Sequence, residues 1–571
     1  MEDMDVQKER RVHLPIVGKK GHGDEPASIE TILAEFEAEQ RKRLGLDQET
    51  KQWKDDIFDH WTASQRQHTT MLCGGLTIAQ DYLISGALEG IGYRVLPLEV
   101  SDNAALNLGK EFGNRGQCNP TYFTVGNLLK HLFYLRDVKK VPVSEIIERY
   151  VFVTAGACGP CRFGTYITEF RKALRDAGFE GFRVLLFQQQ GGLSQATEEA
   201  GLNLNAQFFY RLVLGIMLGD ALNALVYRLR PYEKESGATN RAMEQAKKLL
   251  FQTLRNNEPL FPALFKVRSL FKQIEVDRLR VKPKVSVIGE FWAMTTEGDG
   301  NYELQRFLEG EGAEVDIQIV TNWLLYNIWE HVYDTKERLH LRKDDRGRRG
   351  LAGSNPSKKL AILWVADRGV RLAFQAIANS IGLSGYKLSD MDEVAEAARE
   401  LYNNHLRGGE GHMEVGKLVL NAAHKKSTMT LSVKPFGCMP SSGVSDGVQS
   451  YVTEKYPEAI FLPIETSGDG KVNVHSRVQM MLFKARQTAL AEFRAALEKH
   501  GVTEQSVRDF VAKHPRLAGP LFHPDHFVTH TAADMVHHVA PLMKQGYLKG
   551  SLKRLWERLL PHSQHGAHAL P

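Results

Sequence analysis

The chain has 571 residues, with 73 Lys and Arg against 68 Asp and Glu, 43% apolar residues and five Cys. This composition is that of a soluble globular protein of roughly two to four domains, and it excludes disorder, collagen or a coiled coil as a description of the whole. The net charge of +5 is too dilute over this length for a nucleic-acid-binding platform, which needs a dense basic face.

The sequence carries no recognisable signal for export or membrane insertion. No stretch approaches 18 consecutive apolar residues, and the charged N-terminal segment lacks the apolar core of a signal peptide. We therefore expect a cytoplasmic protein. Thiols stay reduced there, and an odd number of Cys cannot form a closed set of disulfides, so clustered cysteines are expected to be metal ligands or redox groups.

Residues 1–65 form a charged arm with an amphipathic helical run that begins at Ile29. Residues 66–200 then alternate short apolar strands with amphipathic helices, and this alternation predicts a parallel sheet covered by helices. The expected strands are Thr69–Leu72, Tyr93–Leu98, Tyr150–Thr154 and Phe182–Phe187, and the expected helices are 77–90, 121–135 and 164–177.

Residues 201–280 predict a helical connector, and residues 281–490 repeat the alternation of strands and helices, with a helical insertion. The strands expected in this second region are Lys284–Ile288, Glu314–Val320, Thr428–Val433 and Ala459–Ile464. A basic segment near 336–359 is expected to be a loop, and residues 491–571 a helical C-terminal region with a disordered tail. The predicted fold class is α/β, with two doubly wound parallel-sheet domains.

Four of the five cysteines lie in Gly- and Pro-containing loops that lead into predicted helices: Cys118, Cys158, Cys161 and Cys438. In an open α/β sheet, the loops at the carboxyl ends of the strands converge on the crevice where ligands bind. Free backbone N–H groups at a helix start favour an anionic sulfur, and Gly lets the backbone approach a bulky cluster. Thiolate ligation of an iron–sulfur cluster is therefore a chemically sound hypothesis.

Other interpretations of these cysteines stay open. Cys158-Gly-Pro-Cys161 between a strand and a helix matches the thioredoxin active site, although Ala157 stands where thioredoxins usually carry Trp, so a thiol–disulfide oxidoreductase is one alternative. Cys73 also ends a strand and is either a fifth ligand or a core thiol. A structural zinc protein or a non-catalytic scaffold is a further alternative, and His526 and His530 have the i,i+4 spacing of helical zinc ligands.

Four blocks of sequence resemble those of a known family. Gly113-Asn-Arg-Gly-Gln-Cys-Asn-Pro, Gly159-Pro-Cys-Arg-Phe-Gly-Thr-Tyr, Pro435-Phe-Gly-Cys-Met-Pro and Ile464-Glu-Thr-Ser-Gly-Asp-Gly look like the signature blocks of the 2-hydroxyacyl-CoA dehydratase component family. They are closest to its large branch found fused to or beside the ATP-dependent activases of those dehydratases. The similarity runs in order from about residue 68 to about residue 490.

The resemblance implies an oxygen-sensitive iron–sulfur cluster, one four-iron four-sulfur centre, held between two related α/β domains. It assigns the ligand role to Cys118, Cys161 and Cys438, with Cys158 as a fourth ligand of less certain role. It also implies that an ATP-hydrolysing activase on another chain delivers low-potential electrons, which pass to a bound small-molecule substrate such as an acyl-CoA thioester. A homo- or hetero-dimer fits this pattern, and neither nucleic acid nor membrane is expected as a partner.

Further candidate residues flank these blocks. Two acidic Gly turns, Glu297-Gly-Asp-Gly and Ser467-Gly-Asp-Gly, follow predicted strands, so Glu290, Asp299, Glu465 and Asp469 are candidate hydrogen-bonding or proton-transferring groups. Arg162, next to Cys161, is a candidate partner for a cluster sulfide or an anionic substrate. The run Gly411–Leu418 has P-loop spacing, but Leu418 replaces the Ser or Thr that reaches magnesium, so we predict no nucleotide site there.

Overall fold

The computed structural model describes residues 29–45, 61–156, 161–188, 201–339, 355–406 and 409–547. The chain divides into two compact units, Met1–Ile57 and Phe58–Pro571. In the first unit, the described residues form helix α1 (Ile29–Arg43), at the position where the sequence predicts a helical run. Three predictions concern residues outside the described ranges: the role of Cys158, the central part of the basic segment, and the disordered tail.

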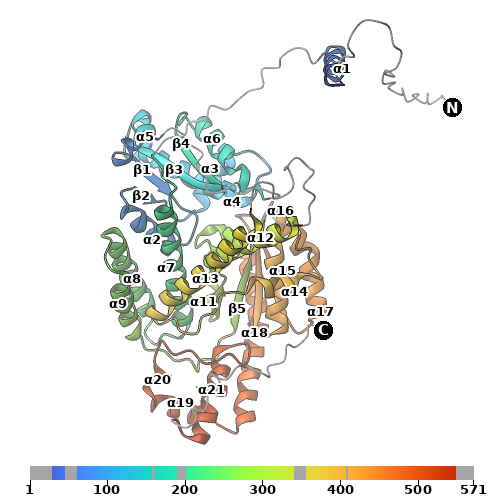
Figure 1. Ribbon diagram of the computed structural model, residues 1–571. Helices are drawn as coiled ribbons and strands as arrows, with labels where there is room; N and C mark the ends of the chain where they lie inside the picture. The colour runs from blue at the N-terminus through green and yellow to red at the C-terminus, as the bar shows by residue number, and fades with distance from the viewer. Residues whose placement is uncertain are drawn as a thin grey trace, which may run out of the picture. The chain divides into compact units, whose positions relative to one another are not determined.

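The first sheet of the larger unit is parallel and has the strand order β2-β1-β3-β4 (Figure 1). Its strands are β1 (Thr70–Cys73), β2 (Arg94–Pro97), β3 (Tyr150–Gly156) and β4 (Arg183–Gln188). In the register, Thr70 of β1 lies between Arg94 and Tyr150. Its helices are α2 (Ile78–Glu89), α3 (Asn103–Phe112), α4 (Asn119–Phe133), α5 (Val143–Arg149) and α6 (Tyr166–Asp176).

The second sheet is also parallel, and its order β6-β5-β7-β8 is the same as that of the first sheet. Its strands are β5 (Lys284–Gly289), β6 (Glu314–Ile317), β7 (Met429–Pro435) and β8 (Ile460–Thr466). The helices of this region are α10 (Phe291–Thr295), α11 (Leu304–Gly310), α12 (Val320–Arg338), α13 (Pro356–Ile381), α14 (Met391–Ala398), α15 (Gly411–Ala423), α16 (Met439–Gly443), α17 (Gln449–Lys455) and α18 (Lys471–His500).

The predicted α/β fold class is confirmed, because both sheets are parallel and covered by helices. In each sheet the order reverses between the first strand and the third, and ligands of open α/β sheets bind at the carboxyl ends of the strands at this switch point. The corresponding strands are β1 and β3 in the first sheet and β5 and β7 in the second. Both switch points therefore lie next to predicted cysteine loops.

The connector consists of three helices, α7 (Ala206–Leu229), α8 (Ala238–Arg255) and α9 (Leu260–Lys272). By length and composition, one segment of the described chain, Ala206–Tyr232, could cross a membrane, but 83% of its most apolar window is buried inside the protein. It is the core helix of a single apolar cluster that extends from α2 through α7 and α8 to the strands of the second sheet. α7 thus joins the two sheets.

Two regions complete the larger unit. The C-terminal helices α19 (Glu504–Ala512), α20 (Pro515–Ala518) and α21 (Thr531–Gln545) pack with α18 around their own apolar cluster. The basic segment predicted as a loop is helical at both described ends, because its first residues belong to the end of α12 and its last residues to the start of α13.

Candidate functional site: a cysteine crevice between the sheets

Cys118 stands at the N-cap of α4, where Pro120 in the first turn needs no hydrogen-bond partner for its nitrogen. Its side chain is buried, and its Sγ lies 3.0 Å from the hydroxyl of Tyr166 and 3.2 Å from that of Thr121. Tyr166 belongs to α6, which follows the loop of Cys161. Cys118 is therefore tied to the loop that carries the next predicted ligand.

Cys438 has the corresponding position in the second half of the unit. It follows β7 and forms the N-cap of α16, and its side chain is also buried. The thiol donates a hydrogen bond of 3.3 Å to the hydroxyl of Ser441, and Ser441 donates one of 2.6 Å to Glu414. Burial raises the pKa of the Cys438 thiol, and the charge of Glu290 raises it further.

The loops of Cys118 and Cys438 touch each other. The backbone N–H of Asn119 donates a hydrogen bond of 2.9 Å to the carbonyl of Phe436. Gly437 has φ +79°, and a Cβ on it would lie 3.1 Å from the carbonyl oxygen of Gln117 and 3.2 Å from the Cα of Cys118. Only glycine combines this conformation with this close approach, so the two cysteine loops from opposite halves form one structure.

Cys161 completes the group. It lies at the N-cap of a 3₁₀ turn, Arg162–Thr165, and is half-buried. Burial raises the pKa of its thiol to about 12, and the charges of Glu410, Glu290 and Cys118 add to this effect. The charge of Glu290 thus raises the pKa of both Cys161 and Cys438, and the charge of Cys118 also raises the pKa of Cys161. The loop contact and these charges place the three cysteines of the predicted ligand set in one neighbourhood, which we call the cysteine crevice.

Three carboxyl groups share this crevice. Burial raises the pKa of Glu290, at the end of β5, to about 7, and raises the pKa of Glu414, in the first turn of α15, to about 8. Burial also raises the pKa of Glu410, which accepts a hydrogen bond of 2.9 Å from the indole of Trp323. Burial thus favours the neutral forms of these three carboxyl groups and of the Cys161 and Cys438 thiols in the folded protein.

The donor set fits a thiolate-ligated cluster. Binding of iron would release the thiol protons, and the free energy of binding would offset the cost of burying charged sulfurs. Within the described residues no three His, Cys, Asp or Glu side chains are arranged to hold a single metal ion. That finding concerns a mononuclear site such as zinc, because the thiolates of an iron–sulfur cluster bind different iron atoms.

The other predicted site residues have different surroundings. Asp299 accepts a hydrogen bond of 3.0 Å from the backbone N–H of Asn103 and lies 3.8 Å from Lys471. Glu465 is exposed and lies 3.4 Å from Lys434, and Asp469 is exposed in the turn before α18. Of the candidate acids, only Glu290 acts on the cysteines.

Two remaining candidates lie near strand ends of the first sheet. Arg162 is half-buried directly after Cys161 and forms no ion pair with a described residue. Cys73 ends β1; burial raises the pKa of its thiol, and the charge acting on it is that of Asp81, not that of Glu290. Cys73 therefore lies apart from the electrostatic group formed by the other three described cysteines, and Cys158 lies outside the described residues.

Sequence reasoning missed Glu410, Glu414 and Tyr166. Glu410 directly precedes the run that has P-loop spacing, and Glu414 lies within it. This run forms the start of α15. Its glycines serve close packing, because a Cβ on Gly411 would meet Tyr402 and one on Gly416 would meet the carbonyl of Val394. A buried carboxyl on a helix has the same sequence signature as a solvated one, so only burial identifies it.

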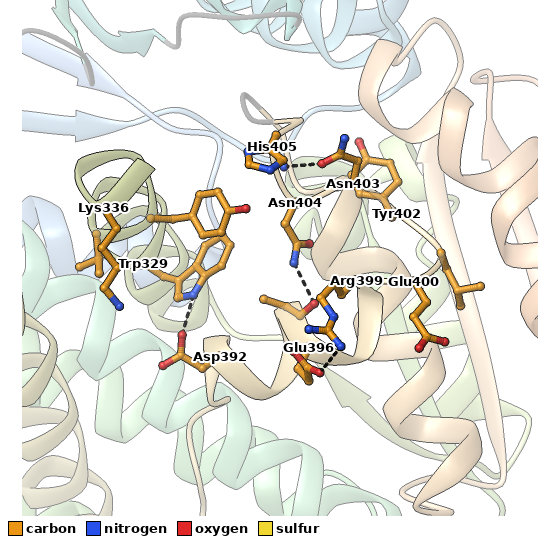
Figure 2. Close-up of a pocket in the computed structure, with 14 residues that line it drawn as sticks. Trp329, Lys336, Asp392, Glu396, Arg399, Glu400, Tyr402, Asn403, Asn404 and His405 are labelled. Atoms are coloured by element: carbon orange, nitrogen blue, oxygen red, sulfur yellow. Dashed lines mark hydrogen bonds and ion pairs between the residues drawn. The ribbon is translucent and has the colours of Figure 1, made fainter. Parts of the chain in front are cut away.

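A separate pocket of about 680 Å³ lies between α12, α14 and the segment that follows α14 (Figure 2). Trp329 and Lys336 line one side of it, and Arg399 and Tyr402 the other. The indole of Trp329 donates to Asp392, and Arg399 pairs with Glu396, so several lining groups already have partners. No described cysteine lines this pocket, and we do not assign it to the cysteine chemistry.

The histidine group after residue 520 is part of the C-terminal packing. His530 is fully buried near Glu492, and His526 lies 3.6 Å from Asp534. Within the described residues this group forms no triad suited to one metal ion, so the structural-zinc alternative gains no support from it.

The chain matches no family model and no curated protein.

Proposed function

We propose that this protein is an iron–sulfur electron-transfer component, similar to the 2-hydroxyacyl-CoA dehydratase component. The observation that carries the proposal is the contact between the loops of Cys118 and Cys438, with Cys161 beside them. These cysteines come from three separate loops of two sheets with the same strand order. A purely structural role for any one thiol would not require the loops to meet.

Cys118, Cys161 and Cys438 would hold the cluster, with Cys158 as a candidate fourth ligand. One four-iron four-sulfur cluster supplies one-electron transfer at low potential, which is set by burial and by hydrogen bonds to the sulfurs. Tyr166 contacts Cys118 directly, so its hydroxyl can donate to that thiolate, whereas Ser441, which contacts Cys438, donates its own proton to Glu414. Cys118 and Cys438 are buried, which limits the access of water to their sulfurs, whereas Cys161 is half-buried.

Glu290 is the residue that we assign to proton transfer. Its pKa of about 7 leaves the carboxyl partly protonated at neutral pH, and one of its oxygens accepts a hydrogen bond of 2.8 Å from the backbone of Ala293. The hydrogen bond fixes the side chain at the end of β5, beside the cysteines. A substrate in the crevice could therefore receive a proton from Glu290.

The remaining parts of the proposal follow the family resemblance. We assign the electron supply to an ATP-hydrolysing activase on another chain and expect an oxygen-sensitive protein in the cytoplasm. The substrate is a small molecule, with an acyl-CoA thioester as the first class to test. A thiol–disulfide oxidoreductase is the main alternative, but the raised pKa of Cys161 is the opposite of what a reactive thiol of that class needs.

Anaerobic purification followed by iron and sulfide analysis tests the proposal. We expect a brown protein with about four iron atoms per chain, bleached by dithionite. Cys118→Ser, Cys161→Ser and Cys438→Ser should each lose most of the chromophore. Cys73→Ser is the matched control and should keep it, because Cys73 lies outside the group.

The same experiment separates the alternatives. A folded, colourless chain with substoichiometric iron after anaerobic reconstitution would overturn the iron–sulfur proposal. A reversible disulfide between Cys158 and Cys161 without metal would support the oxidoreductase, and tightly bound zinc would support the structural alternative.

A further inference from the structure

Cys118 has two hydroxyl groups next to its sulfur. Its Sγ lies 3.0 Å from the Oη of Tyr166 and 3.2 Å from the Oγ1 of Thr121. The side chains of Cys118, Tyr166 and Thr121 are 7%, 6% and 1% exposed. The two hydroxyls come from different helices, α6 and α4, which pack against each other (Figure 1). The sulfur is therefore contacted from two sides in a place where little water can compete with these hydroxyls.

These two hydroxyls are the donors available to a thiolate at Cys118. A sulfur without its proton only accepts hydrogen bonds, so the proton in each contact comes from the hydroxyl. Tyr166 and Thr121 also contact each other, and within the described residues neither hydroxyl has a further acceptor. Two hydroxyls cannot both donate to one another. At least one of the two protons is therefore directed at the sulfur when both are hydrogen-bonded.

The hydroxyl of Tyr166 is held in place by the packing of its ring. Tyr166 is the first residue of α6, and its ring meets that of Phe163 edge-on, with 5.1 Å between the ring centroids. Both rings pack in the apolar cluster that contains Cys118. Phenylalanine at position 166 would keep this packing and remove only the hydroxyl.

The other two candidate ligands have different surroundings. Ser441, which contacts Cys438, donates its proton to Glu414. At Cys161 a hydrogen bond to the sulfur comes from the backbone of Phe163. Among the described candidate ligands, only Cys118 is thus contacted by hydroxyls that can donate to it.

We propose that Tyr166 and Thr121 are positioning residues that set the reduction potential of the cluster from the Cys118 side. The inference rests on the proposed function. An electron added by the external donor makes the ligand sulfurs more negative, so a hydrogen bond to Cys118 stabilises the reduced form more than the oxidised form. The hydroxyls keep their protons and are not oxidised. Loss of the donor therefore makes the reduction potential more negative.

Protein-film voltammetry of the full chain, after anaerobic reconstitution with iron and sulfide, measures this potential. Tyr166→Phe should keep the iron content and absorption spectrum of the wild type. Its reduction should become roughly threefold to tenfold less favourable, which for one electron is a shift of about 30–60 mV to more negative values. Thr121→Val should shift the potential in the same direction, and the double variant should show the largest shift.

Two controls separate the hydrogen bond from a general effect of substitution. Thr121→Ser keeps a hydroxyl at position 121 and should have the wild-type potential. Tyr232→Phe removes another buried hydroxyl, which donates a hydrogen bond of 2.8 Å to Glu314 at the start of β6. Because parallel strands start at the edge of the sheet opposite to the cysteine loops, Tyr232→Phe should leave the potential unchanged.

The possible failures are distinguishable. A potential that is unchanged in Tyr166→Phe, in Thr121→Val and in the double variant overturns this inference and leaves the proposed function intact. Loss of iron from Tyr166→Phe also overturns it, because the hydroxyl would then hold the cluster and not tune it. A wild-type chain that binds no iron overturns the proposed function, and this inference with it.

Discussion

Glu414 is the most deeply buried acid in the cysteine crevice, and only one of its two oxygens has a partner. Oε1 accepts the hydrogen bond from Ser441, whereas Oε2 is buried without one. A charged carboxylate in that position would be costly, so the folded state favours the neutral acid. The group therefore links the stability of the crevice to pH.

We predict that Glu414→Gln reduces the pH dependence of stability. The folded pKa, about 8, lies above the ordinary 4.5, so the folded state binds the proton more tightly than the unfolded chain. The stability that the protonated form provides is full below about pH 4.5 and is lost as pH rises toward about pH 8. Glutamine keeps the acceptor for Ser441 and cannot ionise, so the variant should exceed the wild type by roughly 1–3 kcal/mol at high pH.

Urea unfolding across this pH range measures the effect. Glu290, Asp81 and Asp220 have raised pKa values as well, so the slope should decrease without vanishing. Glu465→Gln, at an exposed site, should leave the slope unchanged. An unaltered slope in Glu414→Gln would show that the carboxyl is already charged in the folded protein.

At the scale of elements, the cysteine loops depend on glycine. Gly437 precedes the N-cap of α16 and touches the loop before α4, and Gly116 occurs in that second loop with nearly the same φ, +80°. A Cβ on Gly116 would meet nothing within 4 Å, whereas one on Gly437 would press on Gln117 and Cys118. Alanine at either position would strain the backbone, but only alanine at 437 would also clash with its neighbours. Comparing the two variants therefore separates the two effects.

Gly437→Ala should lower stability and also separate the two loops. Both Gly116→Ala and Gly437→Ala should lower the free energy of unfolding by about 1–2 kcal/mol, because alanine disfavours the left-handed conformation. Only Gly437→Ala should also weaken iron binding, measured by iron content after anaerobic reconstitution. Equal iron content in the two variants would mean that the loop contact does not set the geometry of the sulfurs.

The sequence predicted some elements better than others, for physical reasons. All eight strands were located, because buried parallel strands are short continuous apolar runs bounded by turn residues. Helix α13 was predicted only as a helical insertion without bounds: its exposed Ile362, Val365 and Leu372 make it apolar on two sides, which hides the helical period. Topology could predict that the loops of Cys161 and Cys438 meet, since both follow parallel strands, but not the place of Cys118, whose loop joins α3 and α4. The buried acids had no such signal.

At the scale of the whole larger unit, polar side chains join the halves as well as apolar packing. Asp220 on α7 accepts hydrogen bonds from Gln80 of α2 and from the backbone of Val320 and Thr321 at the start of α12. This buried carboxylate therefore connects the helices of both sheets. The acidic turn Glu297–Gly300, predicted as a possible substrate site, also contacts the first half of the unit.

Glu297 and Asp299 should stabilise the contact between the halves. Glu297 accepts a hydrogen bond of 2.6 Å from the backbone N–H of Ile78, and Asp299 accepts one of 3.0 Å from that of Asn103. Both donors are free N–H groups in the first turns of α2 and α3, so the second half caps helices of the first. Each substitution by alanine should cost about 0.5–2 kcal/mol, the usual range for a lost helix cap.

Hydrogen exchange distinguishes this role from catalysis. In Glu297→Ala and Asp299→Ala the amides of Ile78 and Asn103, respectively, should exchange faster, while iron content stays near the wild-type value. Asp469→Ala, in the similar turn before α18, is the control, because that side chain is exposed. Since the two caps support one interface, the double variant should lose less stability than the sum of the single losses once the interface opens. Unchanged exchange at Ile78 and Asn103 would show that the acidic turn does not stabilise the contact between the halves. Asp299 would then again be a candidate substrate-binding group.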